Sequence, residues 1–331
     1  MECQDKIAIA KPSEWVKCNL CGSDNTVAIF EERGFNIVKC KICGLVYVNP
    51  RLKDEDRLSI YQDVTKAEAQ WHKRLQIITG KRVVPPARLP DSDLVDELNK
   101  YYQITLDRIE HITHKKNGRI LDIGCGPGLW IYYAKLHGWD AYGFEITKPR
   151  ESIVKDLIKD NILVGERLEE VGFPKKSFDI VTLWHVLEHI PDPAKCLGSV
   201  KELMKDDGLM IVAVPNYHWI RFKAWIMKHI ISEDYYLSSP HFNKWGYFFP
   251  EEHLYNFSLK TLEAYFKKYD LKIKKVFIDW PVQKKSYLSE CIYIILVLIS
   301  RLVNFMTRSR INIYINLTLY AENIPPGEKN S

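Results

Sequence analysis

The stretch Ile120-Leu121-Asp122-Ile123-Gly124-Cys125-Gly126-Pro127-Gly128 decides the fold. It predicts a short apolar strand that ends in a glycine turn and continues into a helix. Glycines allow a close approach of the backbone to a ligand, and they leave the first N–H groups of the helix facing it. A glycine turn alone is also found as a plain strand-to-helix connection. Asp122 adds chemical information, because a carboxylate there would repel a pyrophosphate and attract a cationic group.

A second carboxylate, Glu145, closes the next predicted strand about twenty residues later. A carboxylate at that place can accept hydrogen bonds from both hydroxyls of a ribose. Together, Asp122 and Glu145 predict a nucleoside that bears a positive centre rather than phosphates. A dinucleotide ligand is therefore disfavoured.

Apolar strands alternate with amphipathic helices from Arg119 onward, the pattern of a doubly wound α/β sheet that is mostly parallel. A long helix over Asp91–Lys115 precedes this region, with Asp91 or Ser92 as its cap. The predicted strands are Ile120–Ile123, Ala141–Phe144, Ile162–Val164, Phe178–Leu183 and Leu209–Val214, with Ile273–Ile278 and Ile313–Tyr320 as an antiparallel edge. The predicted helices between them are Leu129–His137, Pro149–Lys159 and Pro193–Lys205.

Four motifs in succession resemble those of class I methyltransferases: LDIGCGPG, GFE, FDIVTLWHVLEHIPDP and GLMIVAVPN. The resemblance implies a Rossmann-like, seven-stranded fold and S-adenosyl-L-methionine as the cofactor. It implies that Asp122, Gly124, Gly126 and Gly128 surround the methionine end, that Glu145 holds the ribose, and that Glu166 lies near the adenine amine. Cys125, inside the turn, and Trp184, after the fourth strand, complete the candidate cofactor-binding residues.

His185, Glu188 and His189 follow the fourth strand and are the candidate catalytic residues. Methyl transfer requires alignment of the acceptor and removal of its proton, for which a histidine suits an oxygen or enol acceptor. The segment is similar to that of ubiquinone-biosynthesis O-methyltransferases, some of which hold a divalent ion with two glutamates and a histidine. His185 replaces the first glutamate, which argues against magnesium because hard cations prefer oxygen ligands. Alternatively, Glu188 and His189 only cap and brace the helix that begins at 191–193.

Two cysteine pairs, Cys18-x-x-Cys21-Gly22 and Cys40-x-x-Cys43-Gly44, are eighteen residues apart. This spacing is typical of a four-thiolate structural zinc site, with unliganded or redox cysteines as the alternative. The segment resembles the N-terminal zinc-ribbon module of bacterial sugar- and polysaccharide-modifying methyltransferases. The ribbon is then expected to cover or bind the acceptor, or to serve only as a docking or stabilising module.

Bulk composition sets the class of protein and its compartment. The 331 residues are 46% hydrophobic, which is sufficient for a sizeable core, and the net charge of +5 is too mild to indicate a nucleic-acid-binding protein. We expect a reducing, cytoplasmic compartment, because the first fifteen residues lack the apolar core of a signal peptide. Oligomeric state is not readable from the sequence.

Two apolar or basic segments, 219–231 and 287–306, suggest peripheral contact with the inner membrane face. Arg301 interrupts the apolar run of the second, which is therefore not expected to span a bilayer. The alternative is that the first is a lid over the acceptor and the second a buried helix. In the segment His253-Leu254-Tyr255-Asn256-Phe257-Ser258, His253 and Tyr255 are expected to line the acceptor pocket or to be part of a helix cap at Ser258.

These observations predict a zinc ribbon at 1–50, a helical connector at 51–117, a methyltransferase core at 118–280 with a lid near 217–258, and an apolar and basic helical insertion with the last strand at 281–331. The function we expect is S-adenosylmethionine-dependent methylation, with oxygen preferred over carbon, of a small-molecule or lipid-linked acceptor such as a sugar or polysaccharide precursor. An Asn/Asp-Pro-Pro-Tyr/Phe run, typical of enzymes that methylate base amines, is missing after the fourth strand. The alternatives are an RNA methyltransferase that contacts RNA through the ribbon, and a non-catalytic zinc scaffold.

Overall fold

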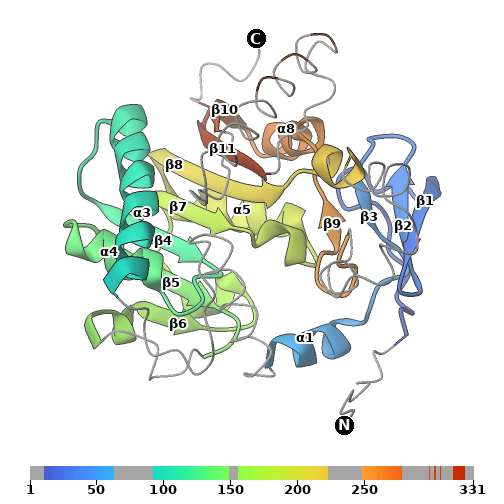
Figure 1. Cartoon of the computed structure of the whole chain (residues 1–331), viewed down its shortest axis with the longest axis horizontal. Coiled ribbons are helices and arrows are strands. Elements are labelled where there is room, and N and C mark those ends of the chain that lie inside the picture. The colour runs from blue at the N-terminus through green and yellow to red at the C-terminus, as the bar shows by residue number, and fades with distance from the viewer. Residues whose placement is uncertain are drawn as a thin grey trace.

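The computed structural model describes residues 11–62, 92–148, 156–222, 248–277 and 316–324, together with Leu298, Leu302 and Met306. Within these residues the chain forms two β-sheets, a large central one and a smaller one that contains the N-terminal strands (Figure 1). Most of the predicted helix at 149–159, and most of the segments at 219–231 and 287–306, lie outside the described residues.

The central sheet has seven strands in the order β10-β11-β8-β7-β4-β5-β6. Strands β4 to β8 are parallel, and β11 is antiparallel to both of its neighbours. The strands are β4 (Arg119–Ile123), β5 (Asp140–Glu145), β6 (Ile162–Val164), β7 (Phe178–Trp184), β8 (Met204–Pro215), β10 (Leu271–Phe277) and β11 (Asn316–Asn323). The predicted doubly wound, mostly parallel sheet with an antiparallel edge is confirmed.

Helices cover both faces of this sheet, because its central strands are apolar on both sides. In β4 and β7, Ile120 and Ile180 pack with α3 and α4, whereas the adjacent Leu121 and Val181 pack with α5 and α8. All four side chains are fully buried, and each burial stabilises the fold by about 1.5–3 kcal/mol. The helices are α3 (Ser92–Thr113), α4 (Leu129–Leu136), α5 (Pro193–Leu203) and α8 (Leu259–Lys268).

Several helices end one or two residues before the sequence prediction. Helix α5 ends at Leu203 instead of Lys205, because Met204 begins β8 and pairs with Phe178 of β7. Only residues 156–159 of the predicted α-helix at 149–159 are described, and they form part of a 3-10 helix. The short 3-10 helices are η1 (Asp156–Asn161), η2 (Leu168–Val171) and η3 (Leu187–His189).

The smaller sheet combines the N-terminal strands with a strand from the distant segment after residue 248. Its order is β1 (Thr26–Glu32), β2 (Phe35–Cys40), β3 (Val46–Val48) and β9 (Tyr255–Asn256), all antiparallel. Arg33 and Gly34 both have positive φ, 52° and 81°, as a tight hairpin turn between β1 and β2 requires. Strand β2 was missed by sequence reasoning, and β9 attaches the predicted lid region to the cysteine-containing module (Figure 1).

Candidate functional site

The glycine turn after β4 is built so that no larger residue fits. Gly124 has φ 67°, and a Cβ there would lie 2.4 Å from Cγ2 of Val186. Gly128, the N-cap of α4, has φ 78°, and a Cβ would lie 2.6 Å from Cδ1 of Ile158. Both glycines are therefore required by the backbone and by close packing, as expected for a ligand-binding turn.

Asp122 and Glu145 lie at the carboxyl ends of the adjacent parallel strands β4 and β5. Asp122 is buried and accepts a 2.6 Å hydrogen bond from Oγ1 of Thr182. Glu145 accepts hydrogen bonds from the backbone N–H of Gly126 at 2.7 Å and from that of Ile146 at 2.8 Å. Burial, together with the negative charges of Glu145 and Asp122, raises the pKa of Cys125 well above its usual value. The turn is thus an electronegative site that suits a cationic ligand.

Aromatic side chains surround the end of β7 next to this turn. Trp184 makes edge-to-face contacts with Tyr101 of α3 and Trp130 of α4, at ring-centroid distances of 6.5 and 6.4 Å. Sequence reasoning named Trp184 but missed Tyr101 and Trp130, since nothing local links them to it. Glu166 is exposed, two residues beyond the end of β6 and at the same edge as Glu145.

The three candidate catalytic residues gather around one carboxylate. Nδ1 of His185 lies 3.6 Å, and Nε2 of His189 lies 3.9 Å, from Oε1 of Glu188. His185 has φ 54°, which turns the chain sharply from β7 into η3. A non-glycine residue rarely adopts this conformation, so the backbone strain is compensated by the surrounding structure.

Glu188 is buried as a charged group. The residue is 1% exposed, and neither carboxylate oxygen has a hydrogen-bond partner among the described residues. Burial by itself raises the pKa of the Glu188 carboxyl, but His185, His189 and His253 outweigh burial and lower this pKa to about 2. The cluster therefore combines a buried anion with imidazoles that can take up a proton. The N-cap of α5 is Asp192, so Glu188 and His189 do not cap that helix.

Comparison with protein families identifies the chain. The family model described as "Methyltransferase domain" matches residues 96–276, which is more than half of the 331 residues. The chain belongs to the methyltransferase domain family. It is a class I S-adenosylmethionine-dependent methyltransferase.

Curated relatives of this methyltransferase match its core. The "Ubiquinone biosynthesis O-methyltransferase" of Haemophilus ducreyi is 30% identical over 122 residues, which covers 33% of this chain and 52% of the relative. The protein of the same name from Rhodopseudomonas palustris is 34% identical over 108 residues, which covers 31% of this chain and 42% of the relative. The chain thus spans about half the length of the curated relatives it matches.

Solved structures of other methyltransferases align with low sequence identity. Magnesium protoporphyrin IX methyltransferase from Synechocystis PCC 6803 is 11% identical with a TM-score of 0.48, covering 82% of this chain and all of that one. An S-adenosylmethionine-dependent methyltransferase from Mesorhizobium loti is 14% identical with a TM-score of 0.43, covering 69% of this chain and 99% of that one. Among the described helices of the methyltransferase, none has the length and apolar character needed to cross a bilayer.

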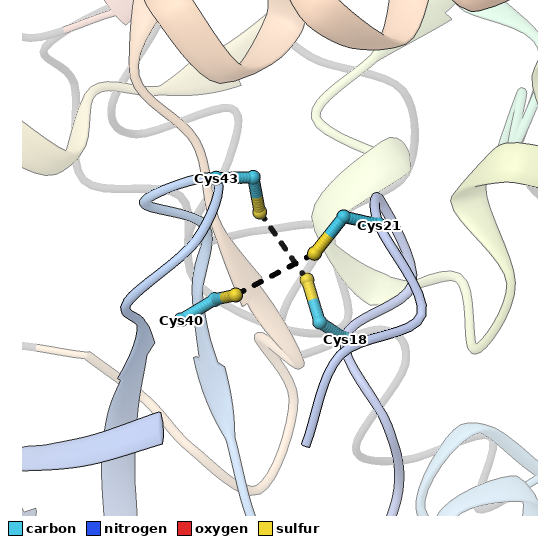
Figure 2. A group of neighbouring side chains, drawn as sticks. All are labelled: Cys18, Cys21, Cys40 and Cys43. Carbon is cyan, nitrogen blue, oxygen red and sulfur yellow. Dashed lines mark hydrogen bonds between the residues drawn. The ribbon is translucent and has the colours of Figure 1, made fainter. Parts of the chain in front are cut away.

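The four paired cysteines of the methyltransferase converge, as Figure 2 shows. The Sγ atoms of Cys18 and Cys43 are 3.4 Å apart, and those of Cys21 and Cys40 are 3.6 Å apart, too far for disulfides. A tetrahedral zinc ion with Zn–S bonds of about 2.3 Å separates its sulfur ligands by about 3.8 Å. The donor set therefore fits a four-thiolate zinc ion.

The thiols of the cluster differ in their pKa: burial raises the pKa of Cys18 above its usual value and raises that of Cys43 to about 11, whereas the pKa of Cys40 is lowered. Burial opposes ionisation of its thiol, but the backbone N–H groups of Cys43 and Ile42 more than compensate and lower the pKa of Cys40 to about 7. Thiolates are the form in which cysteine binds metal ions. The N–H groups of the second cysteine knuckle thus favour the thiolate form of Cys40.

The cysteine module also contacts the segment that presents the catalytic candidates. Arg51 donates a hydrogen bond to the carbonyl oxygen of Pro191 at 3.1 Å. Arg57, in helix α1 (Asp54–Gln62), donates to the carbonyl oxygen of His189 at 3.3 Å. Two arginines from the N-terminal region therefore hold the chain on either side of Ile190.

His253 and Tyr255 have different surroundings. The His253 ring lies 4.6 Å from that of His189, centroid to centroid, so His253 joins the Glu188 cluster. Tyr255 is 3% exposed and donates from its hydroxyl to the carbonyl oxygen of Pro191 at 2.9 Å, which makes it part of the core between the two sheets. Ser258 caps α8 in a capping box with Thr261, as predicted.

Proposed function

We propose that this methyltransferase transfers a methyl group to an oxygen atom of a small or lipid-linked acceptor, with a sugar or polysaccharide precursor preferred over a quinone-like phenol. The observation that carries the proposal is the placement of His185 and Glu188 directly after β7, where Val186 packs against Gly124 of the cofactor turn. A base at that place can serve an acceptor next to the bound methyl donor.

The residues at the turn would hold the cofactor by charge and by backbone contacts. Asp122 and the N–H groups around Gly124, Gly126 and Gly128 would bind the methionine end, and Glu145 would bind the ribose. Cys125, Glu166 and Trp184 would complete the site, with Trp184 supported by Tyr101 and Trp130. The bound cofactor supplies an electrophilic methyl group on a sulfonium.

His185 is the base in this proposal. Its imidazole would accept the proton of the acceptor hydroxyl while the acceptor oxygen forms its bond to the methyl carbon and the carbon–sulfur bond breaks, leaving S-adenosylhomocysteine. The Glu188 carboxylate, 3.6 Å from Nδ1, would stabilise the imidazolium that forms. The relatives' names, which specify O-methylation in ubiquinone biosynthesis, support an oxygen acceptor.

We also propose that Cys18, Cys21, Cys40 and Cys43 bind a structural zinc ion. Four protein ligands leave no open coordination position, so this ion would stabilise the module rather than take part in the reaction. The support is the convergence of the four sulfur atoms and the contacts of the module with the segment after β7.

Peripheral membrane contact through 219–231 and 287–306 is part of the proposal for a lipid-linked acceptor. Leu298, Leu302 and Met306 are helical, four residues apart, and 57%, 58% and 72% exposed. Side chains at this spacing lie on one face of a helix, as in helices that lie in a membrane interface. Co-sedimentation with anionic vesicles at low salt tests this contact, and a protein that stays in the supernatant contradicts it.

Labelled S-adenosylmethionine tests the function itself. The purified enzyme is incubated with cell extract, which is then separated into polar metabolites, lipid-linked glycans and RNA. We expect the labelled methyl group in the metabolite or glycan fraction. It should be attached to oxygen and not to nitrogen. Label found only in RNA contradicts the proposal in favour of an RNA methyltransferase, and cofactor binding without any labelled product favours a scaffold.

A further inference from the structure

The chain that leaves β8 lies against the smaller, N-terminal sheet. Residues 217–222 are helical and follow β8 closely. Tyr217 and Ile220 pack with Ile37 of β2 and Val46 of β3 in one buried apolar cluster, and Figure 1 shows the chain running from β8 toward β3. Because β7 and β8 are parallel neighbours, this segment starts at the edge of the central sheet where β7 also ends.

Lys39 flanks this apolar cluster. It lies two residues after Ile37 in β2, so the two side chains are on the same face of the strand. It is also paired with Val46 across the sheet. A Cβ at Gly44 would lie 3.9 Å from Cε of Lys39, so the lysine stem passes the second cysteine knuckle. The half-buried Lys39 therefore brings a positive charge to the border between the sheet and the segment at 217–222.

His218 and Arg221 add two more nitrogen-bearing groups at this border. They are three residues apart in a helical segment, so they lie on the same side of it. Burial lowers the pKa of His218, and the positive charges of Arg221 and Lys39 lower it further. Screening limits such effects to short distances, so these side chains from two distant parts of the chain lie close together. At neutral pH the imidazole of His218 is uncharged and has one ring N–H to donate.

This group of cations has no counter-ion among the described residues. The arginines of the N-terminal region each pair with a carboxylate: Arg33 with Glu251 at 3.1 Å, Arg51 with Glu14 at 2.6 Å and Arg57 with Asp54 at 3.2 Å. In the described part of the chain, neither Lys39 nor Arg221 forms such an ion pair, and Arg221 contacts the hydroxyl of Tyr217 instead. Neighbouring like charges repel each other, and an anion that binds between them removes this repulsion.

We propose that Lys39, His218 and Arg221 form a binding subsite for a phosphate ester carried by the acceptor. The inference deepens the proposed function and rests on it for the role of the bound molecule. A phosphate monoester carries close to two negative charges at neutral pH, which two permanent cations match, whereas a carboxylate carries one. The guanidinium of Arg221 is suited to bind two phosphate oxygens at once, and the ring N–H of His218 to donate to a third.

The place of the subsite gives the N-terminal module a role in recognition of the acceptor. Lys39 belongs to the module, whereas His218 and Arg221 follow β8, so the subsite is complete only when the module is docked. It lies at the same edge of the central sheet as His185, since β7 and β8 are adjacent and parallel. A phosphate held there would anchor an acceptor whose hydroxyl group reaches the base.

Titration of the full-length protein with inorganic phosphate tests the subsite without methyl transfer. The zinc-loaded protein is saturated with S-adenosylhomocysteine, and the imidazole signals of His218 are followed by NMR at constant pH and ionic strength. We expect a saturable shift of these signals with phosphate and not with chloride. A shift that chloride reproduces, or that does not saturate, overturns the subsite even if the enzyme methylates an acceptor. Saturable binding in a protein that forms no methylated product supports the subsite and contradicts the proposed function alone.

Two variants on different segments assign the charges. Lys39→Met keeps most of the stem and removes the ammonium group, and Arg221→Ala removes the guanidinium. Each should raise the Kd for phosphate by about tenfold or more, as expected for the loss of one charge-assisted contact. Lys53→Ala, which removes an exposed lysine of the N-terminal region, is the matched control and should bind phosphate like the wild type. An unchanged Kd in folded Arg221→Ala contradicts the assignment even where Lys39→Met folds poorly.

Competition decides the source of the phosphate. A nucleoside diphosphate and a polyprenyl phosphate in neutral micelles present the same chemical group on a soluble and on a lipid carrier. At least one of them should displace inorganic phosphate and bind more tightly, because the rest of the molecule adds contacts. Displacement by neither, or by an RNA oligomer alone, contradicts a phosphate subsite for a small or lipid-linked acceptor.

Discussion

Asn19, in the first cysteine knuckle, donates a hydrogen bond from Nδ2 to Oδ1 of Asp192, the N-cap of α5, over 2.8 Å. The amide oxygen of Asn19 accepts from the N–H of Ala194 at 3.0 Å and from the hydroxyl of Tyr265 at 2.9 Å. One side chain of the cysteine module thus joins α5 and α8 of the core. The helix whose start lies just after the Glu188 cluster is held in place by the module.

Asn19→Ala should lower both stability and turnover. The variant removes the hydrogen bonds that Asp192 and Tyr265 make with the Asn19 side chain. We expect the free energy of unfolding to fall by about 1–3 kcal/mol. We expect a reduced kcat with little change in the affinity for S-adenosylhomocysteine, because the cofactor turn is on β4. Urea unfolding and calorimetry measure these effects. Asn25→Ala, exposed on the same module, is the control, and equal kcat in the two variants contradicts the coupling.

Glu145→Gln should weaken cofactor binding. The carboxylate accepts from the N–H groups of Gly126 and Ile146 and is the proposed ribose ligand. Hydrogen bonds to charged groups contribute about 1.5–3 kcal/mol, so the Kd for S-adenosylhomocysteine should rise about 10- to 100-fold. Asp140→Asn, exposed at the start of the same strand, should leave the Kd unchanged. An unchanged Kd in Glu145→Gln shows that the ribose is held elsewhere.

His185→Ala should separate chemistry from cofactor binding. Removal of a general base typically lowers turnover by about 10²- to 10⁴-fold. The affinity for S-adenosylhomocysteine should remain close to that of the wild type, as measured by calorimetry alongside steady-state rates. Near-normal turnover rules His185 out as the base.

Zinc content tests the cysteine module. Freshly purified protein should contain about one equivalent of zinc held by the four cysteines, and Cys43→Ser should lose it together with several degrees of thermal stability. Cys196→Ser, which changes a thiol on α5 outside the cluster, is the control for loss of a thiol. Less than about half an equivalent of zinc in the wild type contradicts the site.

Acid should reveal the ion pairs of Asp179. Its carboxylate lies 2.8 Å from Nζ of both Lys115 and Lys205 and accepts from the N–H of Arg119 at 2.9 Å. Burial opposes ionisation, but these partners outweigh it and lower the pKa of Asp179 below its ordinary 3.8. The unfolded chain then takes up the proton first, so this contribution to stability is complete above about pH 4 and is lost as the pH falls through the folded-state pKa.

Asp179→Asn provides the measurement for that pH dependence. Its free energy of unfolding should lie below that of the wild type at neutral pH, and the two should converge as the pH falls below about 4. Asp206→Asn, which removes an exposed partner of Lys176, should show little difference at any pH. A wild-type advantage that persists unchanged in acid contradicts the mechanism.

Local patterns were sufficient for most of the architecture. The alternation of apolar runs predicted all seven strands of the central sheet to within a few residues at most ends, because the central strands are buried on both faces and the strands are bounded by turn residues. The largest boundary error is the start of β8, predicted at Leu209 and found at Met204, because Met204 pairs with Phe178, a contact that the sequence around Met204 does not encode.

The sequence by itself determined the glycine turn with its two carboxylates, the parallel sheet that presents them, and the two cysteine pairs, since each depends on residues close together in the chain. Tertiary structure decided that His253 joins Glu188 and His189, that Tyr101 and Trp130 contact Trp184, and that β9 completes the N-terminal sheet. Periodicity reports whether a face is buried but not what buries it. These partners are brought together only by the packing of segments that are distant in sequence.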